Sequence, residues 1–110
     1  MTRERKGPWI QTFTGKSFYQ LDPRPEDVDI RDIAHALSMK CRFGGHCIKF
    51  YSVAEHSVLV ARNCYKHPLE ALLHDASEAY LTDVPRPVKP FLGGYKAIEA
   101  AIDCAVAERF

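Results

Sequence analysis

The stretch Leu73-His74-Asp75-Ala76-Ser77-Glu78 places an imidazole beside a carboxylate, with a second carboxylate one helical turn further on. With a rotation of about 100° per residue, a helix through this stretch would present His74, Asp75 and Glu78 on one side. The apolar residues of the same segment would gather on the opposite side: Leu69, Leu73, Ala76 and Tyr80. Imidazole and carboxylate groups suit a divalent cation, although a solvated polar face is the commoner explanation of a single His-Asp pair.

A second histidine favours the cation over the solvated face. His56 has aliphatic residues at its i−3, i+3 and i+4 positions: Val53, Leu59 and Val60. This helical spacing predicts that His56 faces the core. A core histidine is usually neutral and satisfied by one hydrogen bond, so His56 indicates a cation site only in combination with His74 and Asp75.

His56, His74 and Asp75 form an H…HD ligand order, in which the chain resembles the HD-domain metal-dependent phosphohydrolases. The longer match is similar to their 5′-deoxynucleotidase branch and comprises Ala54-Glu55-His56-Ser57, His74-Asp75-Ala76-Ser77-Glu78 and Asp83. It runs from about Arg42 to Lys89 at matched spacing, so it is far more specific than the HD pair alone. The resemblance implies an all-α HD-domain helical bundle, here with a short N-terminal β-hairpin, and release of the 5′-phosphate from deoxynucleoside monophosphates.

The resemblance also implies roles for the polar residues. His56, His74 and Asp75 would hold the metal, and two neutral nitrogens with one carboxylate suit Co, Mn, Fe, Ni or Zn better than Mg. A bound cation neutralises phosphate charge and lowers the pKa of a water molecule. Glu78 would orient the water as a base, with Asp83 as its acid-base partner. Without the resemblance, Asp83 would be read as a turn or cap residue.

Arg42 and Phe43 correspond in spacing to an arginine and a tryptophan that hold phosphate and sugar in the deoxynucleotidase branch. A guanidinium suits a phosphate dianion, and an apolar ring beside the sugar disfavours a buried 2′-hydroxyl without a partner. Phe43 lacks the indole N–H, which makes the deoxyribose preference less secure than nucleotide binding. Lys89 and Arg86 are expected as further phosphate contacts, whereas His46 is equally placed for the cleft or for a structural loop.

The family pattern includes a further aspartate on a later helix as the fourth protein ligand. Asp103 is the only aspartate after Asp83, and helical periodicity groups it with Glu99 and Lys96 on a solvated face. The site could therefore be a three-ligand centre completed by water, part of a longer domain, or a centre completed by a second copy. An incomplete helical core exposes an apolar face, so we expect a homodimer or a larger oligomer.

Two other functions remain open at this point. One is a catalytically weakened HD module that binds a nucleotide or a protein partner without turnover. The other is an HD hydrolase that acts on nucleoside triphosphates or guanosine alarmones.

Composition narrows the class of protein. The sequence has 110 residues and a formal net charge of +1 at pH 7, which suits one small domain and argues against coating of a nucleic-acid polymer. No apolar run could cross a bilayer, so a cytoplasmic protein with no membrane partner is expected. Cys41, Cys47, Cys64 and Cys104 form no C-x-x-C pair and are expected to be reduced and mostly buried. A zinc site at Cys41, His46 and Cys47 is the alternative.

We expect residues 1–110 to form one HD-type domain, with a hairpin and linker over 1–24 and a C-terminally short helical core over 25–110. Alternating residues at 9–13 and 17–21, around Thr14-Gly15-Lys16, predict the hairpin. Asp27 is expected to cap a helix that ends near residues 38–40 and buries Ile30, Ile33, Ala34 and Leu37.

Three further helices are predicted. Ser52 and Glu55 form a capping box that starts a helix running to about Tyr65. Pro68 suits the first turn of the next helix, which should continue to near Thr82. The last helix is expected over about 94–109, with Ile98, Ile102 and Ala105 buried.

Overall fold

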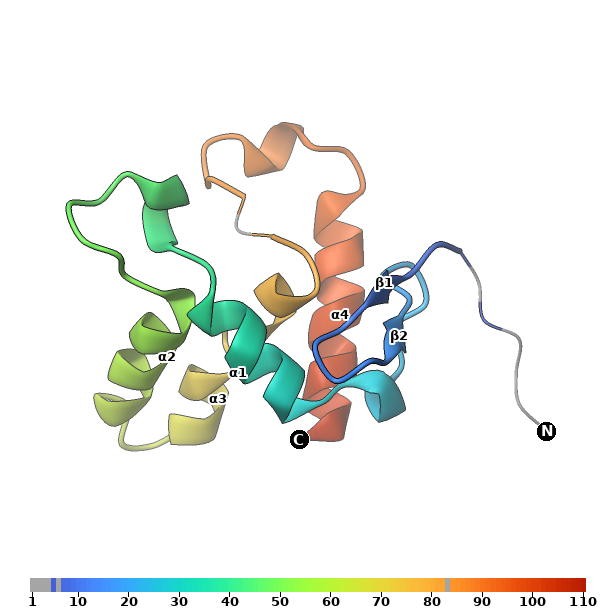
Figure 1. Ribbon diagram of the computed structural model, residues 1–110, viewed down its shortest axis with the longest axis horizontal. Coiled ribbons are helices and arrows are strands. Elements are labelled where there is room, and N and C mark those ends of the chain that lie inside the picture. The colour runs from blue at the N-terminus through green and yellow to red at the C-terminus, as the bar shows by residue number, and fades with distance from the viewer. Residues whose placement is uncertain (1–4, 6, 83) are drawn as a thin grey trace.

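The computed structural model describes residues 5, 7–82 and 84–110. The described chain is mostly helical, with a small two-stranded antiparallel sheet, as the sequence predicts. Its α-helices are α1 (Ile30–Ser38), α2 (Val53–Arg62), α3 (Pro68–Leu72) and α4 (Tyr95–Arg109). Short 3-10 helices lie between them: η1 (Pro25–Asp27), η2 (Arg42–Gly45), η3 (Ala76–Ala79) and η4 (Lys89–Phe91). In Figure 1, α2 and α3 lie side by side at one end, α1 lies in the middle, and the hairpin lies towards the other end.

The N-terminal hairpin is packed against the helical body. Strands β1 (Ile10–Gln11) and β2 (Ser17–Phe18) pair with Ile10 opposite Phe18, so the hairpin is confirmed, with strands shorter than predicted. Phe18 is fully buried, and its ring stacks on Tyr80 at 3.9 Å between centroids. The buried Asp32 carboxylate accepts hydrogen bonds from the amide and the hydroxyl of Thr14, at 2.7 and 3.0 Å. The hairpin is therefore fixed both by apolar burial and by a buried carboxylate.

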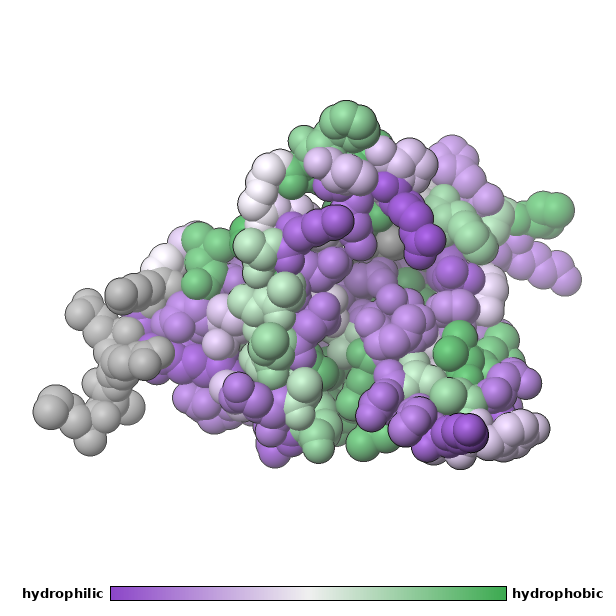
Figure 2. Space-filling model, turned by 180° about the vertical axis from the view of Figure 1, so that it is seen from behind, coloured by the Kyte–Doolittle hydropathy of each residue, from purple (hydrophilic) through white to green (hydrophobic). Residues whose placement is uncertain are grey.

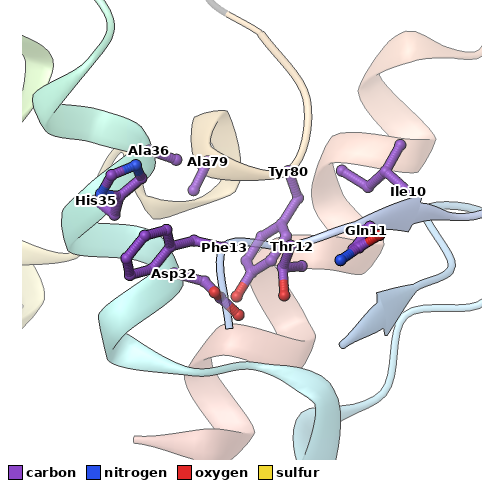
Figure 3. Close-up of a pocket in the computed structure, with 9 residues that line it drawn as sticks. All are labelled: Ile10, Gln11, Thr12, Phe13, Asp32, His35, Ala36, Ala79 and Tyr80. Atoms are coloured by element: carbon purple, nitrogen blue, oxygen red, sulfur yellow. The ribbon is translucent and has the colours of Figure 1, made fainter. Parts of the chain in front are cut away.

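A pocket of about 490 Å³ lies between the hairpin, α1 and η3 (Figure 3). The Phe13 ring of the hairpin stacks on His35 of α1, with 3.8 Å between centroids and 11° between planes. Tyr80 and Ala79 also line the pocket. This stacking gives the hairpin a second attachment to α1 outside the core.

Helix α1 begins at a different cap from the predicted one. The Asp29 carboxylate accepts from the Arg31 amide at 2.9 Å, whereas Asp27 lies in η1 and pairs with Arg5. Pro25 starts the separate 3-10 turn, which displaces the beginning of α1 by two residues. Of the predicted apolar face, Ile33 and Leu37 are buried, but Ala34 is exposed. Ile30 is also largely exposed, because it occupies the first helical position at the edge of the core.

The Ser52 cap is confirmed, because the Ser52 hydroxyl accepts from the Glu55 amide at 3.0 Å at the start of α2. Helix α2 ends at Arg62, three residues before the predicted end. The Asn63 side-chain amide donates to the Leu59 carbonyl at 2.8 Å and satisfies a carbonyl of the last turn. Asparagine is a common residue at a helix end, which explains the early stop.

The predicted continuous helix from Pro68 to near Thr82 is wrong. Helix α3 ends at Leu72, residues 73–75 form a turn, and η3 follows. The Leu73 and Asp75 backbones leave the α conformation, with ψ angles of 6° and 15°. The Lys40 ammonium donates to the carbonyls of Glu78 and Leu81, the second at 3.2 Å, and so holds η3 from the end of α1. The His-Asp pair therefore lies on a turn between two helices.

Helix α4 completes the core against η3 and η1. Gly94 precedes it with a φ angle of +79°, a left-handed conformation that glycine adopts without a Cβ clash. Ile102 and Ala105 are buried and Ile98 is partly buried, as predicted, and Val106 joins them. Among the described helices, none combines the length and apolarity needed to span a membrane.

The segment between η2 and α2 projects from the body and exposes apolar side chains. Ile48 and Phe50 are the exposed large residues of this segment. Its projecting tip is at the left of Figure 1 and at the right of Figure 2, where hydrophobic side chains colour the edge green. Together with η2 and Cys41 before it, this segment forms a projecting loop over residues 41–52, which supplies one wall of the cleft described below.

Tyr80 is expected to make the protein sensitive to alkali. Burial is the main cause that raises the pKa of Tyr80 to about 12, and its hydroxyl accepts from the Asp29 amide. The unfolded chain loses this proton near the ordinary tyrosine pKa of about 10. The stabilisation is therefore present below pH 10 and is lost as the pH rises towards 12, by on the order of 2 kcal/mol.

Urea unfolding at rising pH tests this expectation. Tyr80→Phe should lose less stability than the parent between about pH 9 and 11.5, although its stability at neutral pH falls by about 1 kcal/mol with the lost hydrogen bond. Tyr65→Phe is the matched control, because Tyr65 is 92% exposed. Equal alkaline losses in the parent and Tyr80→Phe would contradict the expectation.

Candidate metal centre

The three residues predicted to bind a metal ion lie close together. His56 of α2 and the His74-Asp75 pair of the turn after α3 each offer a ligand atom, and these atoms lie within 4.8 Å of one another. The His56 and His74 rings are 5.5 Å apart between centroids and cross at 62°. The packing of α2 against α3 therefore brings together residues that are 18 positions apart in the chain.

The contacts of His74 define which of its nitrogens can bind a cation. Nδ1 lies 2.6 Å from the Ala71 carbonyl oxygen, which can only accept, so Nδ1 carries a proton. Nε2 lies 3.1 Å from a carboxylate oxygen of Asp75. If His74 is a neutral imidazole, its Nε2 and the Asp75 carboxylate oxygen are both acceptors. They repel each other unless a cation lies between them. That cation is either a proton, which makes His74 an imidazolium, or a metal ion.

The hydrogen bond to Ala71 is also the usual support of a metal-ligating histidine. Such a histidine donates its other ring N–H to a carbonyl or carboxylate, which fixes the ring and raises the basicity of the ligand nitrogen. The bond exists because α3 ends at Leu72, which leaves the Ala71 carbonyl near the end of the helix. The break in the predicted helix therefore contributes to the site.

His56 lies on the cleft wall, and the prediction that it faces the core is wrong. Its side chain is half-buried, whereas the following residue, Ser57, is buried. The rotation arises because α2 packs on α1 and α3 through Val53 and Ser57. Burial is the main cause that lowers the pKa of His56, and the nearby Arg42 guanidinium lowers it further. His56 is therefore neutral at neutral pH, as a ligand must be.

Glu78 lines the same cleft as the three ligands. Its side chain is half-buried, and it belongs to η3, immediately after the His-Asp turn. The predicted base therefore lies beside the predicted ligands. Asp83, its predicted acid-base partner, lies outside the described residues.

The cleft has a volume of about 660 Å³ and is bounded by the projecting loop, α2, the His-Asp turn and the segment before α4. The predicted substrate contacts line it: Arg42, Phe43, Arg86 and Lys89. His46, which the sequence left open between the cleft and a structural loop, also lines it. Lys89 also pairs with Glu99 at 3.3 Å, so part of its charge is already compensated. Arg86 is exposed at the rim. The cleft thus joins a candidate cation site to several positive side chains.

Arg42 is held by aromatic rings. Its guanidinium carbon lies 4.6 Å from the Phe43 ring centroid and 5.6 Å from that of Tyr51. Tyr51 also contacts the His56 ring edge-on, at 6.3 Å between centroids. Sequence reasoning missed Tyr51, because it lies in a loop without periodicity and is brought back to Arg42 by the hydrogen bond from the Arg42 amide to its carbonyl.

Phe43 has a φ angle of +60°, which is uncommon for a residue with a side chain. Its ring is largely exposed and faces the Arg42 guanidinium. A conformation of this kind costs about 1 to 2 kcal/mol and persists where surrounding contacts hold it. Here Gly44 and Gly45 follow with positive φ angles and allow the sharp turn.

Asp103 lies nearer to the site than the sequence indicates. It is exposed, as predicted, but its carboxylate accepts a hydrogen bond from Ser77 of η3, and desolvation is the main cause that raises its pKa. It also lines a pocket of about 480 Å³ together with His74. In the described part of the chain, the group of converging metal-ligand atoms comprises His56, His74 and Asp75 and does not include Asp103.

The cysteines are free, but the prediction that most are buried is wrong. Cys41, Cys47 and Cys64 are half-buried and Cys104 is exposed, because they lie in loops or on the outer side of α4. The sulfur atoms of Cys41 and Cys47 are 3.3 Å apart. Within the described residues, His46 does not join them in a group with metal-ligand spacing.

Comparison with known proteins gives relatives without an assigned activity. No family model matches the chain. It is 46% identical over 103 residues to the uncharacterized protein YfdR of Escherichia coli K12, a match that covers 93% of this chain and 58% of that protein. It is 40% identical over 116 residues to an uncharacterized protein of Rhodobacter capsulatus, covering 96% of this chain and 59% of that protein. The chain therefore spans about three fifths of the length of these relatives.

Proposed function

We propose that the chain is a metal-dependent phosphohydrolase that releases the 5′-phosphate of nucleotides, with deoxynucleoside monophosphates as the preferred class. The observation that carries the proposal is the pair of acceptor atoms on His74 and Asp75, 3.1 Å apart and close to His56. A divalent cation removes their repulsion and uses all three side chains. The HD-type resemblance supports the same assignment.

The neighbouring side chains suit a nucleotide phosphate. A bound metal ion would compensate charge on phosphate oxygens and lower the pKa of the attacking water. Arg42 would bind phosphate oxygens with its fork of N–H donors, held in place by the Phe43 and Tyr51 rings. Arg86 and Lys89 would add positive charge at the rim of the cleft.

Glu78 would take the proton from the attacking water. It lies in the same cleft as His74 and Asp75, and a carboxylate one turn beyond the ligands can reach a water between metal and phosphate. Phe43 would lie against the sugar, where an apolar surface disfavours a buried 2′-hydroxyl. The preference for deoxyribose rests on this ring and on the resemblance.

The test combines metal binding with phosphate release. Protein stripped with a chelator is titrated calorimetrically with Mn²⁺, Co²⁺, Ni²⁺ and Zn²⁺, and phosphate release is then measured with each metal. We expect one ion per chain and activity that returns on metal addition. A chain that binds none of the four ions would overturn the metal site.

The substrate panel separates the competing functions. It contains deoxynucleoside and ribonucleoside 5′-monophosphates, nucleoside triphosphates and guanosine alarmones, each at the same metal concentration. The proposal requires the highest kcat/KM for a deoxynucleoside monophosphate. Nucleotide binding without turnover under every metal would instead favour the non-enzymatic module.

A further inference from the structure

The Cys41 and Cys47 thiols lie in contact at the base of the projecting loop, with 3.3 Å between their sulfur atoms. A disulfide bond is about 2.05 Å long, so the two sulfurs must approach each other by a further ~1.2 Å to form one. Both side chains are half-buried, which leaves them within reach of a small reagent. The other cysteines, Cys64 and Cys104, lie after α2 and on α4.

Backbone hydrogen bonds hold the two cysteines in this arrangement. Cys41 forms an antiparallel bridge with Ser52, and the next amide, that of Arg42, donates to the Tyr51 carbonyl at 2.8 Å. The Cys47 amide donates to the Gly45 carbonyl at 2.9 Å, which fixes the returning side of the turn. The fold of the loop therefore sets the distance between the two thiols.

We propose that Cys41 and Cys47 form a reversible intramolecular disulfide that closes the turn carrying Arg42, Phe43 and His46. The ring contains residues 41–47 and includes the left-handed Phe43. Closing it restricts the backbone that positions the Arg42 guanidinium in the cleft. Its effect on phosphate binding rests on the proposed function, whereas formation of the bond does not.

The oxidant is a low-molecular-weight disulfide such as oxidised glutathione. The Cys41 thiolate attacks one sulfur of glutathione disulfide and releases one glutathione thiolate. Cys47 then loses its proton and attacks the Cys41 sulfur of the mixed disulfide, which releases the second glutathione thiolate. Two protein thiols are oxidised to a disulfide, and one glutathione disulfide is reduced to two thiols.

The contact between the two thiols favours one order in which they attack glutathione disulfide. The hydrogen bond with Cys41 is the main cause that raises the pKa of Cys47, and burial raises it further. The raised pKa lowers the fraction of Cys47 that is present as the thiolate, which favours Cys41 as the first attacking thiol. Replacing Cys47 should accordingly trap glutathione on Cys41.

Disulfide mapping on the full chain tests the proposal without any activity assay. The protein is equilibrated with defined ratios of reduced to oxidised glutathione, quenched with an alkylating reagent and weighed intact. We expect the titratable thiols to fall from four to two, with the loss of two hydrogen atoms and no added glutathione. Trypsin cleaves after Lys40, Arg42 and Lys49, so the bond should join peptide 41–42 to peptide 43–49.

Single cysteine variants show which two cysteines form the bond. Cys47→Ser should retain glutathione on Cys41 and form no internal disulfide, whereas Cys64→Ser and Cys104→Ser should form the disulfide as the parent does. A disulfide that involves Cys64 or Cys104, a disulfide between chains, or mixed disulfides alone in the parent would overturn the proposal. The parent mapping stands by itself if Cys47→Ser fails to fold.

Phosphate release is then compared between the reduced and oxidised protein. A mapped 41–47 disulfide in a protein without phosphatase activity would contradict the proposed function but leave the redox pair intact. Phosphatase activity in a protein that forms no such disulfide would support the proposed function and contradict the redox pair. Activity that changes on oxidation in the parent, and that does not change in the double variant Cys41→Ser/Cys47→Ser, would support both.

Discussion

Replacing Glu78 by Gln is expected to lower kcat for phosphate release by about 10²- to 10⁴-fold, the usual contribution of a general acid-base group. Glutamine keeps the size of the side chain but cannot take a proton from water. Metal affinity should stay close to that of the parent, because Glu78 is not among the three converging ligands. The hydrogen bonds from the Lys40 ammonium to the Glu78 and Leu81 carbonyls should also persist, because these acceptors are main-chain atoms.

The matched control is Glu70→Gln. Glu70 lies on α3, and its side chain is 82% exposed, so the variant removes one carboxylate without changing the cleft. Its kcat should equal that of the parent. Unchanged turnover in Glu78→Gln would show that this carboxylate only lines the cleft.

Replacing Asp75 by Asn is expected to weaken metal binding by about 10²-fold or more while leaving the metal-free protein at least as stable as the parent. The charge that attracts the cation is lost. In contrast, an amide N–H can donate to Nε2 of His74 across the 3.1 Å contact, which removes the repulsion between two acceptors. Calorimetric titration measures the affinity, and urea unfolding with chelator measures the stability.

Asp103→Asn is the control for this variant, because Asp103 also lies near η3 but outside the ligand group. Its metal affinity should remain within a few-fold of that of the parent. An equal loss in both variants would assign Asp103 to the metal and revise the ligand set. A metal-free Asp75→Asn protein that is much less stable than the parent would instead identify a His74 imidazolium paired with Asp75.

Local signals predicted the start of α2 and the hairpin correctly because nearby residues decide them. The Ser52 hydroxyl bonds an amide three residues away, and Gly15 has the left-handed backbone that the hairpin turn needs. The cap of α1 was misassigned because Asp27 and Asp29 are both suitable residues. The 3-10 turn that begins at Pro25 selects Asp29.

The break between α3 and η3 could not be predicted from periodicity, because the apolar spacing continues across it. Lys40, which is remote in sequence, binds carbonyls of the segment that follows the break, and a contact of this kind leaves no periodic signal in the sequence. The position of Asp103 has a similar origin. Periodicity tells which residues share a helix face, but it does not tell that η3 packs beside that face.

The Lys40 anchor has a consequence for how the site could evolve. Its ammonium binds the carbonyl oxygens of Glu78 and Leu81, atoms that every residue type possesses. Mutational drift at either position would therefore exchange the side chain without removing the anchor. A lineage could lose the carboxylate at Glu78, and with it turnover, while inheriting the same scaffold as a ligand-binding protein.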